Sequence, residues 1–296
     1  MNVFYLGTAL NLASLYMAGG LGAAVSVKSG EFNLGGEGQV YAGGFVAAVF
    51  LAAAVPLPPF IALPAAFLLS FLSAGLLSFF CAFLKFRKRA DYLFTTFITS
   101  AAVIPFVDGL ISGPFRSKSD NLLATAFIPE NFRLTGILKP SPLNISFFFT
   151  LALCILFFFF IYRTAYGRRL QIYGISPIFA RYCAYNSRQL FYTSSFISGG
   201  MHGICGALAV CGTYFACHSG FYGGMGWNSL SAALIAKSNP LLLIPSSLLL
   251  AFLTTYANKA ALYHNFGFDI SALIQALVLF LIAFPWSLPH RAGGSK

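Results

Sequence analysis

Two carboxylates stand among glycines in a stretch that differs from the rest of the chain. Glu31 and Glu37 lie in segment 29–44, SGEFNLGGEGQVYAGG, which has long apolar runs on both sides. A carboxylate beside a bilayer core is costly unless it faces water, protein or a transported solute. Glycine in turn permits turns and close backbone approach. We therefore predict a functional segment, with a polar turn between two membrane helices as the alternative.

A second short segment has the same character. Segment 223–240 begins GGMGWN and ends KSNP, and it is too short to cross a bilayer comfortably as a straight helix. Short hydrophobic segments interrupted by glycine or proline indicate transport sites. We expect segments 29–44 and 223–240 to face one another near a pathway. Trp227 could stack on a flat ring there, or anchor the chain at the membrane interface.

The sequence contains little that would support an enzymatic function. The chain has no Walker A pattern, no histidine and cysteine set with metal-ligand spacing, and no G-x-S-x-G nucleophile elbow. The six cysteines lie singly, and Cys205, Cys211 and Cys217 recur every six residues in a glycine-rich apolar span, which suits packing. We therefore expect no enzyme, no metal site and no cofactor on this chain.

Composition indicates a membrane protein that crosses the bilayer several times. Hydrophobic residues make up 58% of the 296 residues and charged residues 8%, with a mean hydropathy of +0.79. The net charge of +11 is gathered in clusters between apolar runs, so it indicates topology and not nucleic-acid binding. The fold class is therefore all-α and polytopic, with residues 1–296 as a single transmembrane domain.

About nine transmembrane or half-membrane helices fit the apolar runs. The expected spans are 3–27, 40–55, 60–84, 92–112, 145–162, 189–217, 223–236, 241–256 and 270–285. The positive-inside rule places the basic segments 85–89 and 163–188 and the C-terminal HRAGGSK in the cytoplasm. The polar segment 113–144 then forms an external loop. An eight-span version would make 223–236 re-entrant and move the N-terminus inside.

The cytoplasmic loop 163–188, RTAYGRRLQIYGISPIFARYCAYNSR, is more than a connector. It carries five arginines and no acid, and Gly167, Gly174 and Pro177 divide it into short segments. Ser176 can cap a helix that starts at Pro177 and runs to Asn186. That helix would present an apolar and aromatic face, suited either to a partner's groove or to the lipid headgroups.

Three segments, taken in order, resemble one transporter family. The loop RTAYGRRLQIYGISPIFARYCAYN, the segment SGEFNLGGEGQVYAGGF and the segment GGMGWNSLSAALIAKSNPLLLIPSSLLLAFL are similar to the ABC importer permeases for simple sugars, nucleosides and branched-chain amino acids. The likeness is greatest to the short permease of nucleoside-type or riboflavin uptake systems. Ile178 stands where the family often has a charged residue, and His218 and the cysteine series are not family features.

This resemblance implies a type II-like permease fold in a bacterial cytoplasmic (inner) membrane, with a cytoplasmic C-terminus. It implies a cytoplasmic ABC ATPase that carries ATP and Mg²⁺, a second homologous permease, and an external substrate-binding protein or lipoprotein. Membrane lipid surrounds the chain, and no nucleic acid is expected. The residues expected along the substrate pathway are Asn33, Glu37, Gln39, Trp227, Asn228 and Asn239. Those expected to couple to the ATPase are Arg168, Arg169, Pro177, Phe179, Arg181 and Tyr182.

The cargo implied by the resemblance is a small polar solute, first a nucleoside, with riboflavin or a simple sugar next. The sequence leaves other functions open. A proton-coupled secondary transporter would use Glu37, Asp108 or His202 as its proton site and would need no ATPase. A membrane enzyme or a structural scaffold is the third possibility.

Overall fold

A computed structural model describes residues 3–54, 56–117 and 122–264, together with residues 273, 276, 277 and 280. Residues 1–252 form one compact unit and residues 253–296 a second. The predicted span 270–285 lies almost entirely outside the described residues. Asp269, the C-terminal HRAGGSK and, in the external loop, Lys118 and Asp120 lie wholly outside them. The single domain over residues 1–296 stays a prediction.

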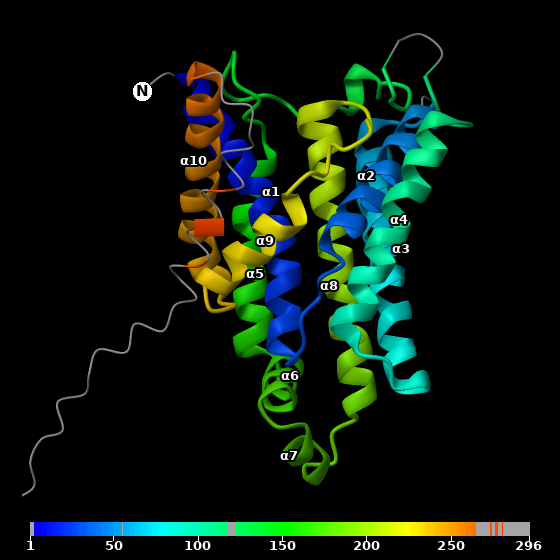
Figure 1. Ribbon diagram of the computed structural model, residues 1–296, viewed down its shortest axis with the longest axis vertical. Coiled ribbons are helices and arrows are strands. Elements are labelled where there is room, and N and C mark those ends of the chain that lie inside the picture. Colours follow the sequence, from blue (N-terminus) through cyan, green and yellow to red (C-terminus); the bar gives the residue numbers. More distant parts are fainter. Residues whose placement is uncertain are drawn as a thin grey trace, which may run out of the picture. The chain divides into compact units, whose positions relative to one another are not determined.

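The described residues form helices joined by turns, with two isolated β-bridges and no strand (Figure 1). The helices are α1 (Val3–Lys28), α2 (Gly36–Ala53), α3 (Pro59–Lys88), α4 (Tyr92–Ser112), the 3-10 turn η1 (Glu130–Phe132), α5 (Ser146–Arg163), α6 (Ala165–Ile175), α7 (Pro177–Tyr182), α8 (Ser187–Ala209), the π-helical turn η2 (Val210–Tyr214), α9 (Met225–Ile235) and α10 (Pro240–His264). The predicted all-α fold is confirmed.

Among the described residues, six helices are long and apolar enough to cross a membrane: α1, α3, α4, α5, α8 with η2, and α10. They differ in how much protein covers them. Most of α1 and α8 is buried inside the protein, whereas most of α3, α4 and α5 is exposed and apolar. Because an apolar surface of this kind suits lipid, α1 and α8 form the interior of the first unit and the other three its outer wall.

Glycines bring α2, α3 and α8 into close contact. A Cβ atom added to Gly206 on α8 would lie 2.6 Å from the backbone nitrogen of Gly44 on α2. One added to Gly203 would lie 2.7 Å from the Cβ of Ala74 on α3. Membrane helices associate through such small residues because apolar surface alone gives them no preference over lipid. The structure thus explains the glycine-rich run in the predicted span 189–217.

Three predicted boundaries are wrong. The helix expected from residue 40 begins at Gly36, so Glu37 and Gln39 are helical. Helix α3 continues to Lys88, which puts most of the basic cluster 85–89 in its last turn, before Arg89 adopts the left-handed conformation with φ 57°. Helix α7 ends at Tyr182 and not at Asn186, because Ala184 is also left-handed.

The described part of segment 113–144, the predicted external loop, packs against the chain that follows α8. Backbone N–H groups of Thr125, Ile128 and Leu134 donate to the carbonyls of Cys217, Phe215 and Cys211 at 2.8–2.9 Å. Ile128 and Phe132 are fully buried. The guanidinium of Arg133 lies 4.8 Å from the ring centroid of Phe215. The described part of this segment is therefore an ordered cover over the end of α8.

Candidate functional site

Helices α2 and α9 are in close contact at Gly36 and Gly226, where neither helix has a side chain to hold the backbones apart. A Cβ atom on Gly36 would lie 3.1 Å from the Cα of Gly226, and one on Gly226 would lie 2.6 Å from the carbonyl carbon of Gly36. The two short segments that the sequence predicts to face one another are therefore in backbone contact.

The Glu37 carboxylate caps the beginning of α9. Its Oε1 accepts a hydrogen bond of 3.1 Å from the backbone N–H of Trp227, and the residue is 8% exposed. The N-cap position of α9 is Gly224, which has no side chain to do this. A carboxylate near a helix N-terminus is stabilised by the unpaired N–H groups and the helix dipole. Glu37 thus joins α2 to α9, and its Oε2 has no hydrogen-bond partner among the described residues.

We predict that Glu37→Ala lowers the stability of the purified protein by about 1–2 kcal/mol, the typical worth of a helix cap, and that Glu37→Gln lowers it less because an acceptor oxygen remains. Thermal unfolding in detergent measures both. Glu130→Gln is the charge-matched control, since the side chain of Glu130 is 89% exposed. Equal losses for the alanine and glutamine variants would contradict the cap.

Asn33 and Gln39 form a buried polar network. The Asn33 amide donates to Gln39 Oε1 at 2.9 Å and to Ser198 Oγ at 3.0 Å, while Gln39 Nε2 donates back to Asn33 Oδ1 at 3.2 Å. Asn33 is 2% and Gln39 4% exposed. The network fixes the α1–α2 loop against α2 and α8, so a solute would reach these groups only after the helices separate.

The other predicted pathway residues differ in position. The Asn228 amide donates to the hydroxyl of Tyr16 on α1 at 2.8 Å, and Asn228 is buried. Trp227 is 46% exposed, so its ring remains available to a ligand or to the membrane interface. Asn239 accepts a 3.0 Å hydrogen bond from the N–H of Leu241 and thereby caps the start of α10. The structure brings Glu37, Trp227 and Asn228 together and leaves Asn239 in a capping role.

Two further residues proposed as proton sites, Asp108 and His202, differ in burial: Asp108 is half-buried and His202 fully buried. Asp108 accepts from the hydroxyl of Tyr41 at 2.5 Å and from that of Ser219 at 2.7 Å. His202 is 1% exposed, with Nδ1 2.8 Å from the carbonyl of Ser198 one turn earlier on α8. Its Nε2 has no partner among the described residues. Asp108 therefore holds α4 to α2 and to the segment after α8.

The sequence reasoning missed the partners of these groups. Tyr16, Ser78 and Ser198 lie on α1, α3 and α8, and each gives a hydroxyl to the buried networks around Asn33 and Asn228. Serine and tyrosine are common enough in apolar spans that nothing marked these three. The available signal was the small-residue run of α1, GGLG at 19–22, whose glycines contact α8, α9 and α10.

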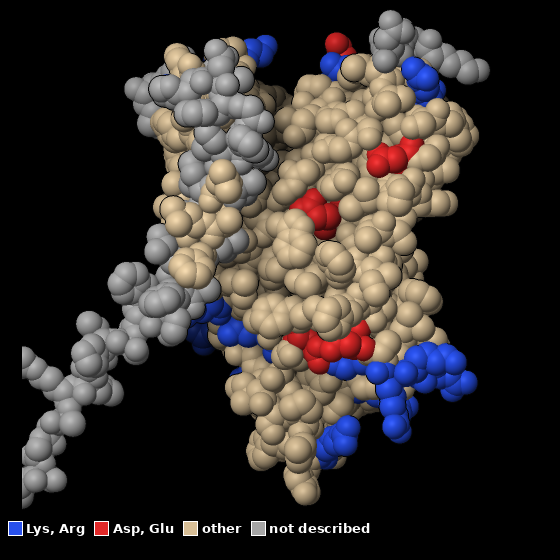
Figure 2. Space-filling model, viewed as in Figure 1, with Lys and Arg blue, Asp and Glu red and all other residues tan. Residues whose placement is uncertain are grey.

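The loop 163–188 folds as two short helices at one end of the first unit. Thr164 caps α6 by accepting from the N–H of Gly167 at 3.0 Å. Gly167 and Gly174, which were expected to divide the loop, both lie inside α6. Ser176 caps α7 by accepting from the N–H of Phe179 at 3.2 Å, with Pro177 in the first turn as predicted. Lysine and arginine side chains gather at this end (Figure 2), where α6 and α7 lie (Figure 1).

Helix α7 exposes large apolar side chains and buries a small one. Ile178 is 68%, Phe179 55% and Tyr182 86% exposed, whereas Ala180 is fully buried. Arg168, Arg169, Arg181 and Pro177 are also exposed, and the Arg169 guanidinium lies 5.5 Å from the Tyr185 ring centroid. Exposed aromatic residues beside arginines are typical of a protein interface. All six predicted coupling residues therefore belong to one exposed surface on α6 and α7.

A buried aromatic cluster attaches this surface to three long helices. Ala180 and Tyr173 pack with Cys81 of α3, Tyr92 of α4 and Phe191 of α8. Burial raises the pKa of the Tyr173 hydroxyl, and the nearby Glu31 carboxylate raises it further while Arg181 lowers it. The hydroxyl thus stays neutral at physiological pH. A displacement of α7 would be passed to α3, α4 and α8 through these rings.

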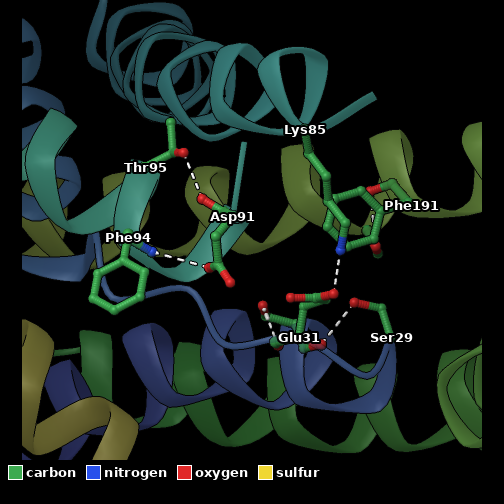
Figure 3. Close-up of polar contacts among 9 residues, drawn as sticks. Ser29, Glu31, Lys85, Asp91, Phe94, Thr95 and Phe191 are labelled. Atoms are coloured by element: carbon green, nitrogen blue, oxygen red, sulfur yellow. Dashed lines mark hydrogen bonds and ion pairs between the residues drawn. The ribbon is translucent and has the colours of Figure 1, made fainter. Parts of the chain in front are cut away.

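The same end of the molecule holds the α1–α2 loop by an ion pair and a backbone contact. Glu31 accepts from the Lys85 ammonium, which lies 4.5 Å from the Phe191 ring centroid (Figure 3). Asp91 does not join this pair; it caps α4 by accepting from the N–H of Phe94 at 3.3 Å (Figure 3). A Cβ atom on Gly30, where φ is 82°, would lie 2.8 Å from the carbonyl oxygen of Gly174 on α6. The loop that carries Asn33 therefore touches α6 directly.

The chain is similar in sequence to several permeases of ABC transporters. The chain is 31% identical over 290 residues to the probable riboflavin import permease protein RfuC of Treponema pallidum, covering 97% of this chain and 76% of that protein. It is 24% identical to the guanosine ABC transporter permease protein NupP of Bacillus subtilis, covering 99% and 85%. It is 24% identical to the glucose ABC transporter permease protein TsgB13 of Haloferax volcanii, covering 93% and 75%.

A protein-family model matches almost the whole chain. The model for the permease component of the branched-chain amino acid transport system matches residues 5–283. The match includes the α1–α2 loop, the short helix α9 and the exposed surface of α6 and α7. The chain belongs to this permease family.

Proposed function

We propose that the chain is the membrane-spanning subunit of an ATP-driven importer, and that the exposed face of α7 receives the ATPase. The observation that carries this proposal is the attachment of α7: an exposed aromatic surface rests on a buried cluster shared with α3, α4 and α8. ATP-driven closure of a cytoplasmic ATPase would push on α7, and the cluster would pass the movement to the long helices. ATP hydrolysis then belongs to the separate subunit, and this chain is not an enzyme.

The Gly30–Gly174 contact gives that movement a second path. Displacement of α6 would shift the α1–α2 loop, since no side chain lies between the two backbones. The loop would carry Asn33 away from Gln39 and Ser198, opening the buried network between α2 and α8. Polar groups freed in this way could then meet a polar solute, which gives the predicted pathway residues a role in one state of a cycle.

For the cargo we propose a small polar solute, first a nucleoside, with riboflavin or a simple sugar next; the first two are flat heterocycles that bear a ribose-like chain. The names of the relatives support these three classes of cargo without ranking them, since they include riboflavin, guanosine and glucose permeases. The exposed ring of Trp227 beside the Glu37 cap offers a stacking surface for such a ring. An external binding protein would deliver the solute, and a second permease would complete the pore.

Gentle isolation of the chain from its native membrane tests this function. We expect an ABC ATPase and a second permease to co-purify. The isolated assembly, in liposomes with ATP and separately added binding protein, should accumulate labelled guanosine, riboflavin or a sugar. A chain that emerges alone and drives uptake from a proton gradient without ATP would support the secondary transporter. In that case Asp108 would have to leave the Tyr41 and Ser219 hydroxyls during each cycle.

A further inference from the structure

A cavity of about 320 Å³ lies where α1 ends, between α6 and the turn from α9 to α10. Lys28 and Lys237 contribute to its wall, together with the polar side chains of Gln171 and Ser238. Ile175 and Leu234 form an apolar part of the wall, and they are 87% and 42% exposed. The cavity therefore combines two cations with an apolar edge at the end of the molecule predicted to face the cytoplasm.

Within the described part of the chain, neither lysine is neutralised by a carboxylate. Among the described residues the ion pairs are Lys85–Glu31 and Arg133–Glu130, and no acidic side chain lines the cavity. The Lys28 ammonium lies 5.6 Å from the ring centroid of Tyr162 at the end of α5, a weak cation–π contact that leaves its charge uncompensated. Two positive charges on one cavity wall repel each other unless an anion lies between them.

The backbone that presents Lys237 is in an unusual conformation. Lys237 and Ser238 follow one another with φ of 50° and 55°, the left-handed region that residues other than glycine rarely adopt. Hydrogen bonds from their N–H groups to Leu234 and Ala233 carbonyls, at 2.9 and 2.7 Å, hold the turn. These two hydrogen bonds form the Schellman motif that commonly ends a helix, and the motif fixes the position of Lys237 at the cavity.

We propose that this cavity binds the headgroup of an anionic phospholipid. The phosphate would lie between Lys28 and Lys237, and the glycerol and acyl chains would leave along Ile175 and Leu234 into the bilayer. Basic cavities between membrane helices on the cytoplasmic side bind such headgroups. The apolar edge favours a lipid over a soluble phosphate, which would gain nothing from it. This inference depends on the membrane-spanning fold and not on the proposed import function.

A bound headgroup would join α1, α6 and the α9–α10 turn at the base of the coupling surface. The cavity shares Gly174 with the contact that holds the α1–α2 loop. We therefore expect anionic lipid to stabilise this junction as well as to bind there. Phosphatidylcholine, which has no net charge, should do neither.

Native mass spectrometry of the full chain in detergent measures the affinity for dioleoylphosphatidylglycerol. We expect Lys28→Gln combined with Lys237→Gln to weaken binding by roughly an order of magnitude, from the typical contribution of each lysine near an anionic surface. The matched control is Arg87→Gln with Lys88→Gln, which removes the same charge from exposed positions on α3. The control variant and phosphatidylcholine binding should be unchanged from the unmodified chain.

A photoreactive phosphatidylglycerol bound to the unmodified chain gives a second test that needs no variant. We expect labelling in segments 171–175 and 234–238. Labelling confined to other segments would overturn the proposal, as would equal losses of affinity in the glutamine pair and the control. Inorganic phosphate that stabilises the protein as strongly as the lipid, in the absence of lipid, would show that the site takes a soluble anion instead.

Discussion

Replacing Phe179 and Tyr182 together by alanine is expected to release the ATPase and to reduce ATP-driven uptake to background. These two rings are 55% and 86% exposed on a helix whose other side is anchored through Ala180. Aromatic residues at the centre of an interface commonly contribute about 2 kcal/mol each, so losing both should weaken ATPase binding by on the order of 1,000-fold. The Ser176 cap and the buried cluster remain, so the permease itself should stay folded.

Co-purification of the ATPase with the tagged permease, followed by uptake in liposomes with ATP, measures both effects. Phe60→Ala with Phe106→Ala is the matched control, because these phenylalanines are 77% and 67% exposed on α3 and α4, far along the chain from α7. We expect the control to keep the ATPase. If the Phe179 and Tyr182 variant kept the ATPase and normal uptake, the proposal that α7 binds the ATPase would be wrong.

Local sequence patterns predicted those elements whose signals lie within a few residues. The span 92–112 was placed correctly from its apolar run, which coincides with α4. The start of α7 was found from the Ser176 cap and the following Pro177. Its end was not, since the left-handed turn at Ala184 has no glycine to mark it.

Roles that depend on contacts between distant helices could not be predicted from the chain alone. Glu37 was expected to face a pathway, but its Oε1 caps a helix that begins 188 residues later, at Met225. Asn33 and Gln39 were expected along the substrate pathway, and nothing in the sequence marked that they bond each other and that Asn33 also bonds Ser198. Polar residues in an apolar span signal that a partner exists, whereas only packing decides whether it is a solute or another helix.

Gly206→Ala is expected to destabilise the protein by about 2 kcal/mol, the typical cost of forcing a methyl group into a well-packed interface. The added carbon would meet backbone atoms of α2, including the nitrogen of Gly44 at 2.6 Å and the carbonyl carbon of Val40 at 3.0 Å. Backbone cannot rotate away as a side chain can, so α2 and α8 would have to separate. That separation would also disturb the Asn33 and Gln39 network and the Glu37 cap on α9.

Gly109→Ala provides the control, because it makes the same chemical change in a different setting. Gly109 lies inside α4, and a Cβ atom built there has no neighbouring atom within 4 Å. Alanine favours helix over glycine by about 1 kcal/mol, so this variant should unfold at the same temperature as the unmodified protein or slightly higher. Thermal unfolding of both purified variants in one detergent gives the comparison. A Gly206→Ala protein as stable as the Gly109→Ala protein would mean that α2 and α8 separate without cost, and glycine packing would then not set the spacing of these two helices.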